Sequence, residues 1–175
     1  STTNQDSLAV KCFNTIKNMY EKDYSEMWSI FYGIHVSQLQ NIETLKMLST
    51  IPEPFFIIDL PIPTNNKLPS LIDCFDTYVK GEILDGDNAV MDESIGSKVS
   101  VKKNIMFWSF PSILVIDIKR FNSQNKKNQI LIDFPLDNLD LSKYVIGYNS
   151  DTYIYDLYGI CNHGGSVFGG HYTAF

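Results

Sequence analysis

The chain has 175 residues, of which 44% are hydrophobic and 13% aromatic, and its formal net charge at pH 7 is −6. This length and composition predict a single globular domain with its own core and exclude an intrinsically disordered chain. The negative charge, without a cluster of Lys and Arg interleaved with aromatic residues, argues against nucleic acid as a partner. No apolar run is long enough to span a membrane and the amino terminus has no signal-peptide pattern, so we expect no membrane association and a cytoplasmic or nuclear location.

The three cysteines have no Cys-x-x-Cys spacing, and each lies beside an apolar residue. We interpret Cys12, Cys74 and Cys161 as buried free thiols of a protein from a reducing compartment. We expect neither a cofactor nor a bound metal.

Residues 4–22 predict an amphipathic helix, because apolar side chains recur at the spacing of one helical face. Thr3 and Asp6 have the spacing of a capping box at its amino end, so helix capping is the plain interpretation of Asp6. The predicted apolar stripe comprises Leu8, Cys12, Ile16 and Met19, widened by Phe13 and Tyr20.

Two β-rich runs follow this helix. Residues 28–36 alternate between the two faces of a strand, and residues 54–60 form a second run that ends at prolines. His35 stands alone in the first run and is better explained as a half-buried strand residue than as a metal ligand. One face of the first strand is expected to carry Ile30, Tyr32, Ile34 and Val36.

A second helix is predicted after Ser70, because Ser70 and Asp73 have capping-box spacing and an apolar stripe follows them. The polar residues 85–97 then predict a flexible tip between two β segments. The stripe of this helix comprises Leu71, Cys74, Phe75 and Tyr78.

Residues 98–121 return to β structure. Within them, residues 113–116 form a continuous apolar run, which is typical of a strand covered on both faces. Lys119 and Arg120 stand at the end of this strand, where solvation alone explains two basic residues.

The next segment is less regular. Residues 122–128 are polar and lack apolar anchors, which indicates a loop. Residues 130–134 alternate as a strand, and residues 139–144 predict a short irregular turn.

The last stretch carries the strongest functional signal. Residues 153–160 alternate as a strand, residues 164–170 form a loop with four glycines, and the strand pattern resumes at His171. One glycine would serve a hairpin turn, so four indicate backbone that must move or lie close to another chain. His171 stands where this loop rejoins the sheet, which suits a catalytic imidazole, although an ordinary hairpin residue also explains it.

Residues 162–166, Asn-His-Gly-Gly-Ser, and 169–175, Gly-Gly-His-Tyr-Thr-Ala-Phe, together resemble the histidine box of the ubiquitin-specific proteases, which are papain-like thiol hydrolases. Residues 4–7, 70–74 and 111–121 resemble further boxes of that family, so the resemblance covers nearly the whole chain.

The resemblance implies an α+β fold with a twisted antiparallel sheet and a few helices. It assigns residues 1–27 to a helix at the edge of the thumb, residues 28–110 to the fingers and residues 111–175 to the palm with the histidine box. The thumb itself, which carries the catalytic Cys in the family, is expected to be missing from this chain.

The resemblance also implies the site. His171 would be the general base, and Asp6, Gly169, Gly170 and Tyr172 would contact the tail of ubiquitin. The residue three positions after Asp6 is Ala9, where the family usually has a second acidic contact, Glu. The nucleophilic Cys and the group that orients the base both fall outside the matched boxes, so this chain alone is expected to be inactive.

Family members commonly bind zinc in the fingers through two Cys-x-x-Cys knuckles. Here the four matching positions hold no thiol, so a tetrahedral zinc site is not expected. These positions are Gln40, Glu43, Met91 and Ser94.

The sequence therefore predicts part of a cysteine-type deubiquitinase, whose partner is ubiquitin or a ubiquitinated protein. A catalytically inactive ubiquitin-binding scaffold is the alternative, since Ala9 and the absent zinc ligands also suit it. A metal-dependent hydrolase using His35, His163 and His171 is disfavoured, because no two of these histidines share a ligand-like spacing with a carboxylate.

Overall fold

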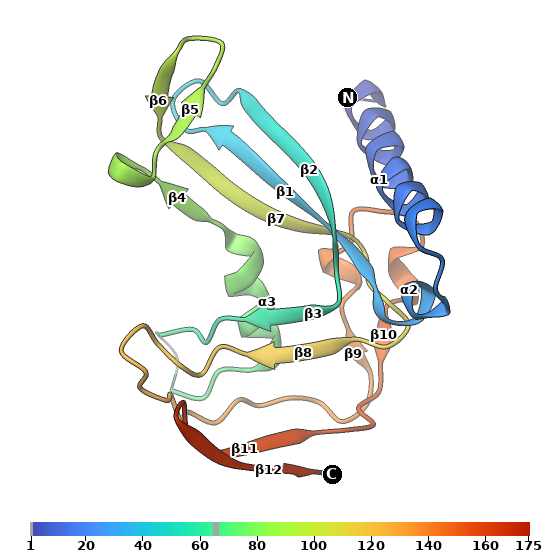
Figure 1. The fold of residues 1–175 in the computed structure, drawn as a ribbon, viewed down its shortest axis with the longest axis vertical. Coiled ribbons are helices and arrows are strands. Elements are labelled where there is room, and N and C mark those ends of the chain that lie inside the picture. The colour runs from blue at the N-terminus through green and yellow to red at the C-terminus, as the bar shows by residue number, and fades with distance from the viewer. Residues whose placement is uncertain (1, 65–66) are drawn as a thin grey trace.

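A computed structural model of the protein describes residues 2–64 and 67–175, with side chains from Ser7 onward (Figure 1). The helices are α1 (Thr2–Lys22), α2 (Glu26–Phe31) and α3 (Leu71–Lys80). The strands are β1 (Gly33–Asn41), β2 (Met47–Phe55), β3 (Ile57–Leu60), β4 (Glu82–Leu84), β5 (Val90–Asp92), β6 (Ser97–Val99), β7 (Val101–Ser109), β8 (Val115–Ile118), β9 (Leu139–Asp140), β10 (Ile154–Tyr155), β11 (Cys161–Ser166) and β12 (Gly169–Ala174). Short 3-10 turns cover Gly86–Asn88, Ser142–Tyr144 and Ser150–Thr152.

The largest sheet has the antiparallel order β2-β1-β7-β4. Helix α1 lies against one face of it (Figure 1), where Cys12 packs with Ile34 and Val36 from β1. The predicted stripe is thus confirmed at Cys12, but Phe13 is 65% exposed. One residue turns a helix by about 100°, which rotates Phe13 away from the sheet.

The main core lies on the opposite face, between the sheet and α3. Phe107 on β7 is fully buried and lies 4.4 Å from Phe110, ring centre to ring centre. The predicted capping box of α3 is present, because the Ser70 hydroxyl accepts from the Asp73 amide at 3.1 Å and the Asp73 carboxylate accepts from the Ser70 amide at 2.8 Å. Phe75 and Cys74 on the predicted stripe of α3 are completely buried.

Residues 28–31 are helical and not the start of a strand. The Ser25 hydroxyl accepts from the amide of Met27 and caps α2, and the rings of Trp28 and Tyr32 lie 4.2 Å apart, one helical turn from each other. The run predicted over residues 54–60 is divided at Phe56 into β2 and β3.

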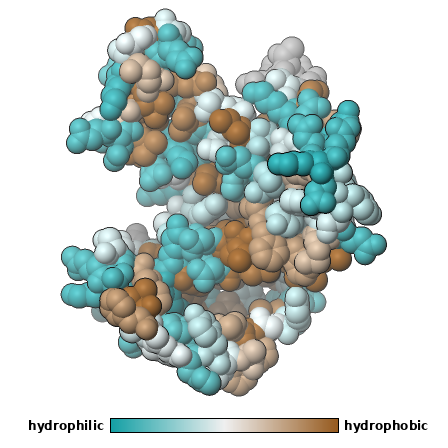
Figure 2. Space-filling model, in the orientation of Figure 1, coloured by the Kyte–Doolittle hydropathy of each residue, from teal (hydrophilic) through white to brown (hydrophobic). Residues whose placement is uncertain are grey.

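Strands β3 and β8 form a separate two-stranded sheet in which they run parallel, whereas the large sheet is antiparallel as expected. Figure 1 shows this pair beside α3, below the large sheet. Figure 2 shows the molecule hollowed between the tip that carries β5 and β6 and the lower part built around β8.

Three further predictions differ from the structure. Residues 85–97 include β5 and the turn that leads into its antiparallel partner β6 and are therefore partly β structure. Residues 130–134 form no regular strand, because Asp133 bonds through its backbone to Pro69 and Leu71. Of the strand predicted over residues 153–160, only Ile154 and Tyr155 belong to a regular strand, β10, which pairs with β9.

Candidate active site

His171 lies on the β11–β12 hairpin, where it pairs with Gly164 across the strands. The four glycines of the predicted loop lie within the two strands, and only Val167 and Phe168 form the turn. Because side chains alternate between the faces of a strand, His171 projects to one face and Tyr172 to the other. The imidazole of His171 is exposed, and no hydrogen bond or ion pair joins it to another described residue.

Gly165 and Gly170 pair with each other across the two strands. Gly165 has φ +131°, and a Cβ placed there would lie 2.6 Å from the Gly169 carbonyl oxygen. A Cβ on Gly170 would overlap the Gly164 carbonyl oxygen and the ring of His163. Gly169 has open space around it. Of the two glycines predicted to contact a tail, Gly169 is restricted by its φ of +159°, and Gly170 by the neighbouring atoms that a side chain would overlap.

The face opposite His171 carries an aromatic pair. The His163 ring stacks on Tyr172 at 4.6 Å between centroids, with 26° between the planes. The Lys127 ammonium donates to the backbone carbonyl of His163 and lies 3.4 Å from its Nδ1. Lys127 also lies 5.7 Å from the centroid of the Phe121 ring. Tyr172 is 66% exposed and remains accessible to a ligand.

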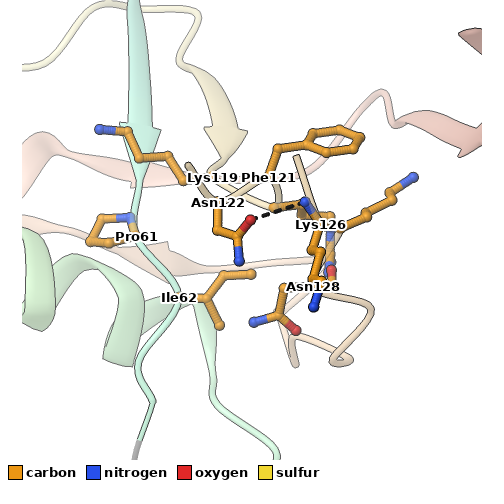
Figure 3. Close-up of a pocket in the computed structure, with 9 residues that line it drawn as sticks. Pro61, Ile62, Lys119, Phe121, Asn122, Lys126 and Asn128 are labelled. Atoms are coloured by element: carbon orange, nitrogen blue, oxygen red, sulfur yellow. Dashed lines mark hydrogen bonds between the residues drawn. The ribbon is translucent and has the colours of Figure 1, made fainter. Parts of the chain in front are cut away.

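The loop of residues 121–128 borders an open cavity of about 490 Å³. Asn122 and Asn128 lie close to Ile62 at this cavity (Figure 3), and the Asn122 side chain accepts from the Lys126 amide at 2.9 Å. Arg120 is not simply solvated, because its guanidinium donates to the carbonyl oxygens of Asn128 and Ile130 at 3.1 and 2.8 Å. The loop is thus held by side-chain bonds to its own backbone.

A pair of carboxylates stands beside this loop, where Asp59 on β3 pairs in register with Asp117 on β8. Partial burial and the neighbouring Asp59 raise the pKa of Asp117 above its ordinary value. Lys119 forms an ion pair with Asp59 at 3.3 Å and offsets part of the repulsion. This pair was not anticipated from the sequence, since it depends on the parallel pairing of β3 and β8.

A nucleophilic thiolate would have to lie next to the imidazole of His171. None of the three cysteines does so. Burial raises the pKa of Cys12 to about 11 and also raises the pKa of Cys74, so both remain thiols at neutral pH. Cys161 is exposed, contrary to the prediction that all three are buried. It lies three residues from Gly164, the partner of His171, and therefore projects to the opposite face of the hairpin.

Asp6 lies within the backbone of α1, and its side chain is outside the described residues. Its predicted contact with a ubiquitin tail stays a prediction.

Of the four knuckle positions, Gln40 lies in β1 and Met91 in β5, whereas Glu43 and Ser94 lie in the turns that follow these strands. Asn41 accepts from the amides of Glu43 and Thr44, and Asp92 accepts from the Ser94 amide at 2.9 Å and its hydroxyl at 2.6 Å. Lys46 joins the two turns, since its ammonium donates to the Ser94 hydroxyl at 2.7 Å and lies 3.7 Å from the Asp92 carboxylate.

In the part of the chain with described side chains, no group of three His, Cys, Asp or Glu residues is arranged to hold a metal ion. No helix of that part is long and apolar enough to cross a membrane. His35 is half-buried, stacks on Phe55 at 5.7 Å and contacts Glu53 at 3.3 Å, which accounts for it as a strand residue.

Comparison with known proteins decides the family, because the chain matches the model of ubiquitin carboxyl-terminal hydrolases over residues 3–175. The chain belongs to the ubiquitin carboxyl-terminal hydrolase family. The predicted resemblance is confirmed, and the three helices and mainly antiparallel sheets of the described residues fit part of a ubiquitin-specific-protease catalytic domain.

Several members of this family are similar to the chain over most of its length. It is 34% identical over 165 residues to ubiquitin carboxyl-terminal hydrolase 21 of Homo sapiens, covering 90% of this chain and 29% of the relative. It is 37% identical over 131 residues to ubiquitin carboxyl-terminal hydrolase 9 of Arabidopsis thaliana, covering 73% and 14%. It is 32% identical over 159 residues to ubiquitin carboxyl-terminal hydrolase 2 of Gallus gallus, covering 89% and 44%. The chain thus spans less than half the length of each of these relatives.

Proposed function

We propose that this chain is the fingers and palm of a cysteine-type deubiquitinase, which hydrolyses the peptide or isopeptide bond after the C-terminal Gly of ubiquitin. In this proposal residues 1–27 form a helix at the edge of the thumb, residues 28–110 the fingers and residues 111–175 the palm. The observation that carries it is the exposed imidazole of His171, which directly follows Gly170 on a hairpin too tight there for any side chain.

His171 would act as the general base. Cleaving an amide through a thiol requires a group that removes the thiol proton, and a well-placed base contributes on the order of 10²–10⁴-fold to the rate. The imidazole of His171 is exposed and makes no hydrogen bond to a described side chain, so its ring nitrogens are accessible to a thiol. Its neighbour Gly170 leaves the backbone bare, which suits a substrate whose last residues are glycines.

The remaining predicted contacts serve binding. Tyr172 offers an exposed ring on the other face of the hairpin, and Gly169 has open space around it. The hollow between the fingers and the lower part of the molecule would receive the body of ubiquitin (Figure 2). Asp6 would contact an arginine of the ubiquitin tail.

The nucleophile would come from a part of the natural protein outside these 175 residues. The raised pKa values of Cys12 and Cys74, and the position of Cys161 on the wrong face of the hairpin, leave no described thiol to react with His171. The same observation also favours the second candidate function, an inactive ubiquitin-binding scaffold. We propose a cytoplasmic or nuclear location in either case.

The test uses the full natural protein and a fluorogenic ubiquitin amide. The proposal predicts hydrolysis by the wild type, and a loss of hydrolysis in His171→Ala with the affinity for ubiquitin largely unchanged, because the imidazole acts on the proton and not on the tail. Binding of ubiquitin without any hydrolysis by the wild type would support the scaffold. Equal hydrolysis by wild type and variant would refute the role of His171.

A further inference from the structure

We propose that Lys127 is a positioning residue, which clamps the loop of residues 121–128 onto the β11–β12 hairpin and so fixes the strand pair that carries His171. The inference rests on the proposed function, since it gives His171 its catalytic role. Nothing in the pattern of the sequence singles out Lys127, which stands in a polar loop 36 residues before its partner His163.

The hairpin presents a free backbone carbonyl at the point where Lys127 binds. Ile160 and Phe175 exchange two backbone hydrogen bonds at 2.9 Å, so they form a hydrogen-bonded pair. Such pairs alternate with non-hydrogen-bonded ones along an antiparallel ladder, and the pair of His163 with Tyr172 is therefore of the second kind. The His163 carbonyl consequently points away from β12.

This carbonyl lies at an open edge. Among the described strands β11 pairs with β12 alone, so no neighbouring strand supplies a donor to the His163 carbonyl. The Lys127 ammonium supplies it. A charged donor to a carbonyl forms a stronger hydrogen bond than a neutral amide does, so this one contact holds the edge firmly.

The other end of the clamp is anchored to the core. The backbone of Lys127 bridges to that of Phe121, and the Asn122 amide donates to the Lys126 carbonyl at 3.1 Å. The Arg120 guanidinium ties the end of the same loop to the segment that follows it. The loop continues directly from β8, whose Ile116 and Ile118 pack against the main core. Lys127 thus connects a peripheral hairpin to a fixed part of the fold.

The clamp acts on His171 through the hairpin and not by contact. Lys127 lies on the face of His163 and Tyr172, whereas His171 projects to the other face. Losing the clamp would let the hairpin tilt, and a displacement of about 1 Å at a catalytic group can lower the rate about 100-fold.

The experiment compares three variants of the full natural protein with the fluorogenic ubiquitin amide. Lys127→Met keeps the length of the side chain and removes the donor, and it should lower kcat about 10- to 100-fold with a smaller change in KM. Lys127→Arg retains a charged donor and should recover most of the loss. Lys126→Met is the matched control, because the Lys126 ammonium makes no hydrogen bond or ion pair to any described side chain, and it should behave as the wild type.

Amide hydrogen exchange provides a readout that does not depend on activity. Residues 161–174 should exchange faster in Lys127→Met than in the wild type, while α3 and β7 should be unchanged. Wild-type exchange of the hairpin in Lys127→Met would overturn the clamp, and so would wild-type kcat in that variant of an active enzyme. Retained activity in His171→Ala would refute the proposed function separately from the clamp. If the wild type itself were inactive, hydrogen exchange of the hairpin would still test the clamp.

Discussion

Replacing Gly170 by Ala tests whether close packing of the hairpin positions His171. The added Cβ would overlap the carbonyl oxygen of Gly164, which is backbone, and the ring of His163, which is stacked on Tyr172. Overpacking of this kind destabilises by about 1–3 kcal/mol. Since β11 pairs with β12 alone among the described strands, we expect the strain to open the hairpin locally and not to unfold the core.

Amide hydrogen exchange measures this opening directly. A change of about 1–3 kcal/mol corresponds to exchange about 5- to 150-fold faster over residues 161–174. In the active full-length protein, the same variant should lower kcat, because His171 is the next residue. Gly170→Val, with a larger side chain, should in addition raise KM, because the substrate tail could not be seated.

Gly159→Ala is the matched control, because a Cβ there would lie 3.9 Å from its nearest neighbour, the Phe175 carbonyl oxygen. It should leave the exchange of the hairpin unchanged. If Gly170→Ala and Gly159→Ala gave equal exchange rates over residues 161–174, the close approach of the two strands would not be needed to hold His171.

Three further predictions concern the rest of the chain. Purified protein should contain no stoichiometric zinc and keep its Tm in chelator, and metal lost together with the fold would contradict this. Lys46→Met should accelerate amide exchange in the two turns that Lys46 joins. Iodoacetamide should label Cys161 first and Cys12 only after unfolding, and peptide mass spectrometry would detect the labelled residues. Equal labelling of both in the native protein would argue against the burial of Cys12 between α1 and β1. Asp117→Asn should raise the Tm at pH 7 and lose this advantage in acid. The pKa of Asp117 is raised in the folded state, so its carboxyl group stabilises the fold below the ordinary carboxyl pKa of about 3.9. This stabilisation of the wild type disappears as the pH rises through the raised pKa. Calorimetry at several pH values would check it, and an advantage that persists in acid would refute the electrostatic cause.

Local signals in the sequence predicted helices α1 and α3 well. The spacing of Ser70 and Asp73 identified the start of α3, because a capping box depends only on residues near each other in the chain. The stripe around Cys12 identified the buried face of α1 for the same reason.

Signals that depend on distant partners were missed or misread. Residues 28–31 alternate like a strand, yet Ser25 caps a helix there and the rings of Trp28 and Tyr32 lie 4.2 Å apart, with 51° between their planes. Residues 130–134 also alternate, but their backbone bonds to the segment before α3. The contact of Lys127 with His163 has no periodic signature at all, and only the fold brings the two residues together.

The central claim is that His171 is the general base of a deubiquitinase, and the rate of ubiquitin-amide hydrolysis by the full natural protein and its His171→Ala variant tests it most directly. We predict that the wild type turns over the substrate and that the variant loses on the order of 10²–10⁴-fold in kcat while it binds ubiquitin with nearly unchanged Kd. A variant that hydrolyses the amide as fast as the wild type would contradict the claim.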